Sequence, residues 1–411
     1  MSNYLIKGET LTNIANAIRT KTGKTDSIAT DNMATEISGI SGGLTINGII
    51  EQYKVQAGKT VNAGDFVEFV KAVSWGSGTF NSGNTKEMSA CKLNDNSVLV
   101  AYQDGGNSTC GTAVVLTINA TSVLVGTKVV FSSVKTSKIS VVALSESKVL
   151  VAYNASSNGK AIVLSISGTT ITVGTAKTLD TLDETGVSTL SAVALSESKV
   201  LVAYENYGNS RYGTAVVLSI SGTTISVGTN TVFNSATTQN VLAVALSESK
   251  VLVAYYASSN SNVIVLTVDG SAITVGTETA FDSGSMNYNS VCKLNENKVL
   301  ITYQDGGNSV YGATQVLTID GATITAGAKT IFNSADTYEI ACIAFSSTSA
   351  VVFYNNLSNG YYKGLTIDGT TITLNTEVKN ETLVLPSETV INGIANTSGT
   401  AGETVEVYVP S

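Results

Sequence analysis

The chain has 411 residues, of which 31 are acidic and 23 basic, so its formal net charge is −8. Hydrophobic residues make up 43% and charged residues only 13%, which is too apolar for a disordered chain. The sequence contains no histidine, which excludes Ser-His and Cys-His nucleophile pairs and histidine metal sites within it. The acidic balance argues against nucleic acid as a partner, and no apolar stretch reaches the roughly 20 residues of a membrane-spanning helix.

Residues 1–43 differ in composition from the rest of the chain and are predicted to form a helical attachment segment and a hinge. Apolar residues lie at helical spacing around Ile14 and again around Ile37, separated by the polar stretch TGKTDS. Neither short helix can bury its apolar face alone, so we expect the two to pack on each other or on a partner. The SGG sequence at 41–43 predicts the hinge.

Short alternating strands separated by Ala-Gly turns occur near both ends of the chain. They lie in KVQAGKTVNAGDFVEFV at 54–70 and in INGIANTSGTAGETVEVYVPS at 391–411. Each stretch is too small to stand alone. We therefore predict one small β-module made of two parts, residues 44–70 and residues 377–411.

The middle of the chain, residues 71–376, is built from a tandem repeat. The decamer LSESKVLVAY occurs three times without change, and three divergent copies share its final tyrosine. Successive landmark tyrosines are 51, 51, 51, 48 and 51 residues apart, at Tyr102, Tyr153, Tyr204, Tyr255, Tyr303 and Tyr354. A period of this size indicates a repeat architecture with six copies.

Each copy reads as four strands joined by tight turns. Around Tyr204 the predicted strands are 191–195, 199–204, 214–219 and 224–233, with the turns SESK and SGTT between them. The second strand is apolar on both faces, which is typical of a strand covered on both sides, and the fourth alternates. This gradation favours an all-β fold, a six-bladed β-propeller of four-stranded blades, over a β-solenoid or fibrous trimer.

Loop length alternates between odd and even repeats. The distance from the landmark tyrosine to the leucine of the third strand is 14, 11, 14, 11, 14 and 11 residues. The longer loops are QDGGNSTCG at 103–111, ENYGNSRYG at 205–213 and QDGGNSVYG at 304–312. The alternation favours six blades, with seven as the alternative. An extra outer-strand copy at 73–80 is predicted to pair with the last blade near 371–374 and close the ring.

No cofactor and no metal site is expected. The four cysteines, Cys91, Cys110, Cys292 and Cys342, lack C-x-x-C spacing and read as small buried hydrophobic residues. The DGGNS turns offer oxygen ligands, but each turn provides too few for calcium. Their Asp and Asn residues are better explained as stabilising the turn.

The sequence favours a protein that is not an enzyme. A glycosidase needs two facing carboxylates, whereas Glu146, Glu197 and Glu248 recur at equivalent turns and read as solvated. The DGGNS turns resemble the Asp-box turns of sialidase-like propellers, without the aromatic residue of that motif. The arginine cluster that such enzymes use is missing too, since the only arginines are Arg19 and Arg211.

Binding is better supported, because sequence variation gathers at one end of the repeats. There tyrosines lie among Asn, Ser, Asp and Gly, a mixture that suits both paratopes and sugar sites. The alternative for part of this set is scaffold packing, since Tyr212 and Tyr311 share a position with Cys110. The candidate ligand-binding residues are Asp104, Asn107, Glu205, Tyr207, Asn209, Tyr212, Tyr288, Asp305, Asn308, Tyr311, Tyr338 and Tyr361.

The two ends of the chain carry a resemblance to a known family. LTNIANAIRTKTGKTDSIATDNMATEISGI at 11–40 resembles a helical N-terminal segment of tail and baseplate-associated proteins of tailed bacteriophages. The matching positions are Ile14, Ala15, Ile18, Arg19, Thr22, Gly23, Lys24, Met33 and Ile37. AGDFVEFV and GIANTSGTAGETVEVYV are similar to small β-modules of phage virion proteins. The resemblance covers about a fifth of the chain.

This resemblance implies a virion tail protein of the receptor-binding or tail-fibre type, assembled in the host cytoplasm and acting outside the cell. Its partners would be other tail proteins, through residues 1–40, and a host cell-surface glycan or protein, through the variable loops. The alternatives are a structural tail, baseplate or capsid-decoration protein without a ligand, and a polysaccharide depolymerase. The sequence leaves the oligomeric state open, including a homo-oligomer.

Overall fold

The computed structural model describes residues 48–54, 60–61, 66–68, 79–118, 122–156, 158–179, 187–356, 359–375, 391–395, 399–400 and 404–410. The helices and hinge predicted in residues 1–43 lie outside this set. The chain divides into two compact units, Met1–Ser74 with Asn380–Ser411, and Trp75–Lys379. The described residues form antiparallel β-sheets throughout, which confirms the predicted all-β class. No helix among them is long and apolar enough to cross a membrane.

The smaller unit joins the two ends of the chain in one antiparallel sheet of order β1-β34-β32-β3. Strand β1 (Gly48–Lys54) pairs along its whole length with β34 (Thr404–Pro410). Strand β32 (Ile391–Ala395) links β34 to β3 (Phe66–Glu68), and β2 (Thr60–Val61) pairs with β33 (Gly399–Thr400). Hydrogen bonds between strands more than 300 residues apart therefore hold this unit together.

In the larger unit the first two repeats share one nine-stranded sheet and each of the next four has a sheet of its own, which makes six consecutive repeats. Each runs from a first to a third strand in order, and the outer strand then returns along the third. The first repeat has β4 (Thr85–Asn94), β5 (Ser97–Asp104), β6 (Cys110–Ile118) and β7 (Val123–Val125), and the second has β8 (Val129–Ser145), β9 (Lys148–Ala155), β10 (Asn158–Ser167), β11 (Thr170–Val173) and β12 (Lys177–Thr178). The third has β13 (Val187–Ser196), β14 (Lys199–Asn206), β15 (Tyr212–Ser221), β16 (Thr224–Val227) and β17 (Thr231–Thr237), and the fourth has β18 (Gln239–Ser247), β19 (Lys250–Ala257), β20 (Asn260–Asp269), β21 (Ala272–Val275) and β22 (Thr279–Ser283). The fifth has β23 (Met286–Asn295), β24 (Lys298–Asp305), β25 (Tyr311–Asp320), β26 (Thr323–Ala326) and β27 (Thr330–Asp336), and the sixth has β28 (Tyr338–Ser346), β29 (Ser349–Asn356), β30 (Asn359–Asp368) and β31 (Thr371–Leu374).

Local sequence explains these hairpins. Gly222 takes a left-handed φ of 61° in the two-residue turn between β15 and β16, a conformation that favours glycine in tight hairpins. The outer strand differs from its prediction, which was a single strand over 224–233. It divides into β16 and β17: the N–H of Gly228 makes the last bond of the β16 register, to the carbonyl of Val217 at 2.9 Å, and β17 then pairs with β15 one residue out of that register. Strand β8 is the outer strand of the first repeat and the first strand of the second.

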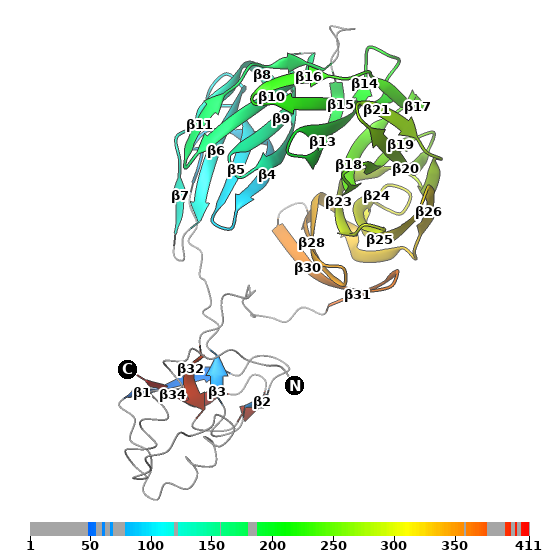
Figure 1. Cartoon of the computed structure of the whole chain (residues 1–411). Helices are drawn as coiled ribbons and strands as arrows, with labels where there is room; N and C mark the ends of the chain where they lie inside the picture. The colour runs from blue at the N-terminus through cyan, green and yellow to red at the C-terminus, as the bar shows by residue number, and fades with distance from the viewer. Residues whose placement is uncertain are drawn as a thin grey trace, which may run out of the picture. The chain divides into compact units, whose positions relative to one another are not determined.

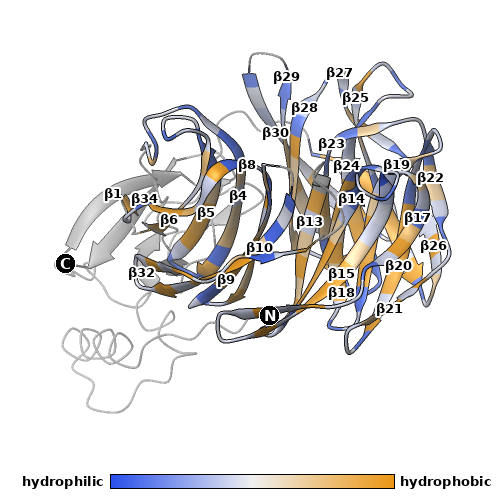
Figure 2. Ribbon diagram, turned by 90° about the horizontal axis from the view of Figure 1, so that it is seen from above, coloured by the Kyte–Doolittle hydropathy of each residue, from blue (hydrophilic) through white to orange (hydrophobic). Residues whose placement is uncertain are grey.

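The core lies between neighbouring repeats, because the second and third strands of the second to fifth repeats are buried on both faces. In β14, Val202 faces the second repeat and Leu201 faces the fourth. At these boundaries a phenylalanine of one repeat contacts the landmark tyrosine of the next, edge to face or tilted. The ring centroids are 5.1–5.6 Å apart in Phe131–Tyr153, Phe233–Tyr255, Phe281–Tyr303 and Phe332–Tyr354. Hydrophobic colour follows the strand interiors in Figure 2, and hydrophilic colour gathers at the turns.

The first strands of neighbouring repeats pack side by side in the order β4, β8, β13, β18, β23 and β28. Figure 1 shows the repeats as an arc with these first strands on its inner side and β7, β11, β26 and β31 on its outer side. The arrangement is β-propeller-like, with each repeat placed as a blade beside the next.

Candidate functional site

The antiparallel register divides each repeat into two edges. In the fifth repeat, Asp305 at the end of the second strand pairs with Met286 at the start of the first and with Tyr311 at the start of the third. Tyr311 pairs in turn with Asp336 at the end of the outer strand. We call this the loop edge, since it carries the long loops and the connections between repeats. The opposite hairpin edge carries the SESK and SGTT turns.

The long loops of the first and fifth repeats are fastened to the connection that follows them. Gln304 is buried and donates from Nε2 to the carbonyl oxygen of Thr337 at 2.6 Å, and Gln103 makes the same bond to Thr136 at 2.5 Å. The N–H of Thr337 donates to the carbonyl of Val310 at 3.2 Å. These reciprocal bonds hold the loop against the start of the next repeat.

The aspartates of these loops serve the turn backbone. Asp305 is 1% exposed, and its Oδ1 accepts the N–H of Gly307 at 3.0 Å. Asp104 is 8% exposed and accepts the N–H of Gly106 at the same distance. Both were candidate ligand-binding residues, and the structure buries both side chains, so neither offers its carboxylate to solvent. Their burial agrees with the turn-stabilising interpretation.

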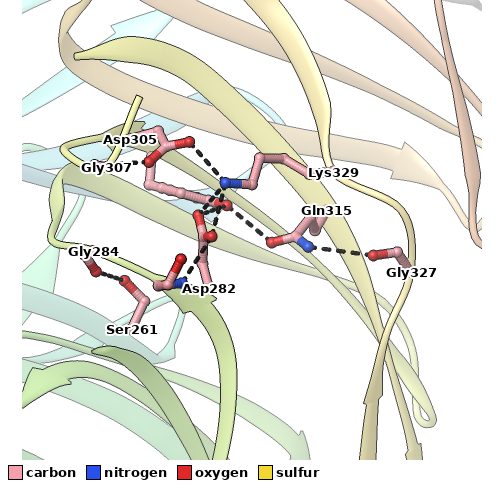
Figure 3. Close-up of polar contacts among 10 residues, drawn as sticks. Ser261, Asp282, Gly284, Asp305, Gly307, Gln315, Gly327 and Lys329 are labelled. Carbon is pink, nitrogen blue, oxygen red and sulfur yellow. Dashed lines mark hydrogen bonds and ion pairs between the residues drawn. The ribbon is translucent and has the colours of Figure 1, made fainter. Parts of the chain in front are cut away.

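An ion cluster with buried carboxylates and a partly exposed lysine links the fourth and fifth repeats (Figure 3). Lys329 Nζ lies 2.7 Å from the carboxylate of Asp282 and 2.8 Å from Oδ2 of Asp305. The hydroxyl of Tyr303 lies 2.7 Å from Oδ2 of Asp282 and 2.9 Å from Oε1 of Gln315. Burial raises the pKa of Tyr303, and the hydrogen bond to Asp282 raises it further. Because its acids are satisfied within the protein, the cluster is a joint between repeats.

The third repeat has a different loop. Glu205 stands where the others have glutamine, is 1% exposed, and accepts a hydrogen bond from Nε of Arg211. Burial raises the pKa of Glu205, and Arg211 and Lys138 act in the opposite direction. The guanidinium carbon of Arg211 lies 5.5 Å from the ring centroid of Tyr207, whose side chain is 45% exposed. An exposed aromatic-cationic pair thus rests on a buried carboxylate.

A second feature of the loop edge is a β-bulge at the start of the first strand, which places one residue at positive φ. These residues are Glu87 (52°), Lys138 (51°), Asn240 (54°), Tyr288 (43°) and Glu339 (50°). Non-glycine residues rarely adopt this conformation, and bulges that re-aim side chains are frequent beside functional sites. The five positions hold four residue types, with Glu in both the first and the sixth repeat, whereas the landmark tyrosine is kept in every repeat.

Neighbouring bulge residues interact across the boundaries between repeats. The N–H of Lys138 donates to Oε2 of Glu87 at 3.0 Å. Asn240 donates from Nδ2 to the carbonyl of Met286 at 2.7 Å and accepts from Nδ2 of Asn289 at 2.9 Å. Sequence reasoning found only Tyr288 among the bulge residues. The available signal was that this position varies among the repeats, with Glu in two of them, whereas the SESK turn is identical in three.

The structure does not bring the twelve candidates into one cluster. Tyr288 and Tyr338 meet edge to face with centroids 5.4 Å apart, and Glu205 and Tyr207 are joined through Arg211. Tyr361 stacks on Tyr354 in the sixth repeat at 5.5 Å. Tyr212 and Tyr311 are partly buried in the slot of Cys110, as the scaffold interpretation expects, and three residues lie exposed at the loop tips: Asn107, Asn209 and Asn308.

The described residues offer no cluster of three or more Cys, Asp or Glu side chains that would hold a metal ion. All four cysteines are free thiols. Burial raises the pKa of Cys91 to about 12, which keeps its thiol protonated near neutral pH.

Comparison with known proteins finds similarity in the fold, among solved structures. No family model matches the sequence, and no curated protein matches it. The Hadza microbial sialidase Hz136 is similar at 9% identity and a TM-score of 0.46 over 70% of this chain, which spans 66% of that protein, just under two thirds. A hypothetical selenium-binding protein from Sulfolobus tokodaii is similar at 7% identity and a TM-score of 0.50, with 76% of this chain and 77% of that chain covered.

A protein from Lactobacillus plantarum is similar at 12% identity and a TM-score of 0.50, with 68% of this chain and 81% of that chain covered. At identities this low the likeness concerns the backbone alone, because binding and catalysis depend on individual side chains. The sialidase activity of Hz136 therefore says nothing about the chemistry of this chain. What the chain shares with the two proteins of TM-score 0.50 is the fold alone.

Proposed function

We propose that this protein is a phage virion tail protein whose repeats close into a six-bladed propeller and whose loop edge binds a carbohydrate receptor on the host cell. The observation that carries the binding proposal is the chemical variety of the bulge residues. Five left-handed positions hold Glu, Lys, Asn, Tyr and Glu, whereas all six repeats keep the landmark tyrosine. A position that served packing alone would keep one residue type, as the landmark tyrosines do.

The chemistry of the loop edge suits a sugar. Tyr288 and Tyr207 are 44% and 45% exposed, and an aromatic ring offers a flat apolar surface to the face of a sugar ring. Amide and carboxylate groups of the neighbouring bulge residues supply hydrogen bonds for hydroxyl groups. Because the loops are fastened by buried bonds such as Gln304–Thr337, little conformational entropy is lost when a ligand binds.

Ring closure is supported by an incomplete sixth repeat. In each of the five preceding repeats the outer strand has two parts, and the second part pairs with the first half of the third strand. In the sixth repeat, among the described residues, only the first part, β31, pairs with the third strand, β30. Phe80 already packs on Tyr102 at 5.3 Å, the same joint that the other phenylalanines make. We propose that residues 73–80 supply the missing strand of the sixth repeat.

The open faces at the two ends of the arc agree with closure. Phe345 and Phe353 of the sixth repeat are 52% and 41% exposed, where the equivalent Leu246 and Ala254 of the fourth repeat are buried. In the first repeat Val98 and Leu116 are partly buried, where Val200 and Leu218 of the third repeat are fully buried. Each face would cover the other if the two ends met.

The assignment to a phage tail rests on the sequence resemblance of residues 11–40 and of the two end segments. In this proposal residues 1–40 attach the protein to other tail components and leave the loop edge free. Immunolabelling of intact virions tests this: antibodies against the loop edge should bind, whereas a structural spacer would have that edge covered.

The binding proposal is tested with purified protein, a panel of bacterial cells and a glycan array. Replacing both Tyr288 and Asn240 by alanine should reduce cell and glycan binding at least tenfold, since both residues lie at the loop edge. The matched control is Glu197→Gln in the SESK turn of the hairpin edge, which should bind as the unmodified protein does. Equal binding by the two variants, or binding to neither cells nor glycans by the unmodified protein, would end the proposal. Release of reducing ends would favour the depolymerase alternative.

A further inference from the structure

The loop of the third repeat, residues 205–213, shares its backbone with the corresponding loops of the first and fifth repeats but not its side chains. Arg211 has a φ of 62°, and its counterparts Thr109 and Val310 have 60° and 56°. The N–H of Tyr212 donates to the carbonyl of Asn209 at 2.9 Å, as that of Tyr311 does to Asn308 at 3.1 Å. Because the three loops share one backbone conformation, differences between them come from their side chains.

The side chains of the third loop bring a charge into a buried position. Gln103 and Gln304 donate their amides to the connection behind the loop, but an ionised glutamate has no hydrogen to donate. Glu205 takes the same position with 1% exposure, so its carboxylate is desolvated. A buried charge is unfavourable unless it is paired, and Arg211 provides the pair. For packing alone the glutamine of the sibling loops would serve.

The presence of Glu205 in place of the glutamine holds the side chain of Arg211 in position at the surface. Nε of Arg211 is held by Glu205 and the guanidinium carbon lies 5.5 Å from the centroid of the Tyr207 ring, while 38% of the side chain stays exposed. Within the described part of the chain, the hydrogen bond of this guanidinium runs through Nε, and neither Nη is used in it. The planar fork of an arginine matches a carboxylate with two parallel hydrogen bonds, which an ammonium cannot reproduce. Arg211 is also one of only two arginines in the chain.

Tyr207 and the loop tip complete the surroundings of this arginine. Tyr207 replaces the glycine found in both sibling loops and is 45% exposed, and Asn209 and Ser210 are exposed beside it. The charge of Glu205 is offset by Arg211, and Lys138 lies near enough to act on Glu205 as well. The loop is therefore not locally acidic, although the chain carries a net charge of −8.

We propose that Arg211 and Tyr207 form a subsite for a carboxylate-bearing sugar, with the carboxylate on the guanidinium fork and the sugar ring against the tyrosine. This inference rests on the proposed receptor binding and names the chemical class of the receptor as an acidic glycan. Glu205 is a positioning residue in it, since its carboxylate touches the arginine and is itself buried.

The test is an array of acidic polysaccharides printed beside their carboxyl-reduced forms, in which a –CH₂OH group replaces the carboxylate and the ring is unchanged. The full chain should bind at least one acidic glycan and lose that binding on carboxyl reduction. Arg211→Lys keeps the charge and removes the fork, so its affinity for the acidic glycan should fall roughly ten- to hundredfold. Binding of any carboxyl-reduced glycan should stay the same.

A double variant, Glu205→Gln with Arg211→Thr, gives the third loop the chemistry of the first. It should fold normally, because the new glutamine can donate to the Thr238 carbonyl as Gln103 does to that of Thr136. Circular dichroism and thermal unfolding check this. The variant should lose the preference for the acidic form over the reduced form.

The outcomes separate this inference from the function on which it rests. If the protein binds cells or glycans but carboxyl reduction makes no difference, or both variants keep the preference, the subsite is refuted and the receptor face stands. If it binds neither cells nor glycans, both proposals fail. Arg211-dependent binding to a phosphodiester polymer without binding to any carboxylate glycan would refute the carboxylate assignment.

Discussion

The side-chain amide of Gln304 donates to the carbonyl oxygen of Thr337 across 2.6 Å, and both residues are buried. The bond ties the end of one repeat's second strand to the start of the next repeat, and Gln103 repeats it with Thr136. In the third repeat the same position holds Glu205, whose charge is met by Arg211. This buried position therefore holds either a glutamine bonded to a backbone carbonyl or a glutamate paired with an arginine, and the chain contains both arrangements.

Because a glutamate at this position is paired with an arginine in the third repeat, we predict that Gln304→Glu alone is destabilising. It removes the amide donor and buries a carboxylate with no arginine beside it, which should lower the free energy of unfolding by about 2 kcal/mol or more. Adding Val310→Arg rebuilds the pair of the third repeat and should recover most of the loss. Urea denaturation of the single and double variants measures both values. Additive effects of the two changes would contradict the prediction.

The raised pKa of Glu205 predicts a specific dependence of stability on pH. Because burial makes the folded pKa higher than the unfolded value of about 4.3, the folded state binds a proton more tightly than the unfolded state does. The contribution of Glu205 is therefore greatest in acid and declines as the pH rises from about 4.3 through the folded pKa. The free energy of unfolding of Glu205→Gln, followed by urea titration from acid to neutral pH, should lack this decline. Parallel profiles for the two proteins would refute it.

Removing Lys329 should be more damaging than altering one of its partners. Lys329→Met leaves Asp282 and Asp305 facing each other without a cation, and because Lys329 itself is exposed we expect the free energy of unfolding to fall by about 1–2 kcal/mol. The matched control is Asp282→Asn, which copies the Asn81–Lys128 arrangement of the first repeat and should cost less than about 1 kcal/mol. Thermal and urea unfolding compare the two; equal losses would show that Lys329 is not the centre of the cluster.

Ring closure makes a prediction for Phe353. In a closed ring the side chain is packed against the first repeat, and Phe353→Ala should cost about 3 kcal/mol, as for a core phenylalanine. On an open arc the side chain is 41% exposed and its loss should change the free energy of unfolding little. Phe233→Ala, inside a joint that is already closed, is the reference for a core loss. A near-zero effect at Phe353 alone would refute closure.

Much of the fold follows from local patterns in the sequence. The strand predicted over 199–204 is observed as Lys199–Asn206, and its double-sided burial is confirmed by Leu201 and Val202 facing different neighbours. The division of the outer strand was not predictable from alternation, because it is a one-residue shift in the register with β15 between β16 and β17. The candidate site was predicted less well: Tyr288 and Tyr338 do meet, whereas Asp104 and Asp305 are buried under their own loops.

The sequence by itself determined the repeat length, the four-strand pattern and the alternation of long and short loops, since each is written in the spacing of neighbouring residues. Only the tertiary structure decided which side chains meet across the boundary between repeats. Lys329 pairs with the buried carboxylate of Asp305, and Arg211 pairs with that of Glu205. Such pairings arise from strand register and burial, which bring together residues whose separation along the chain carries no signal of contact.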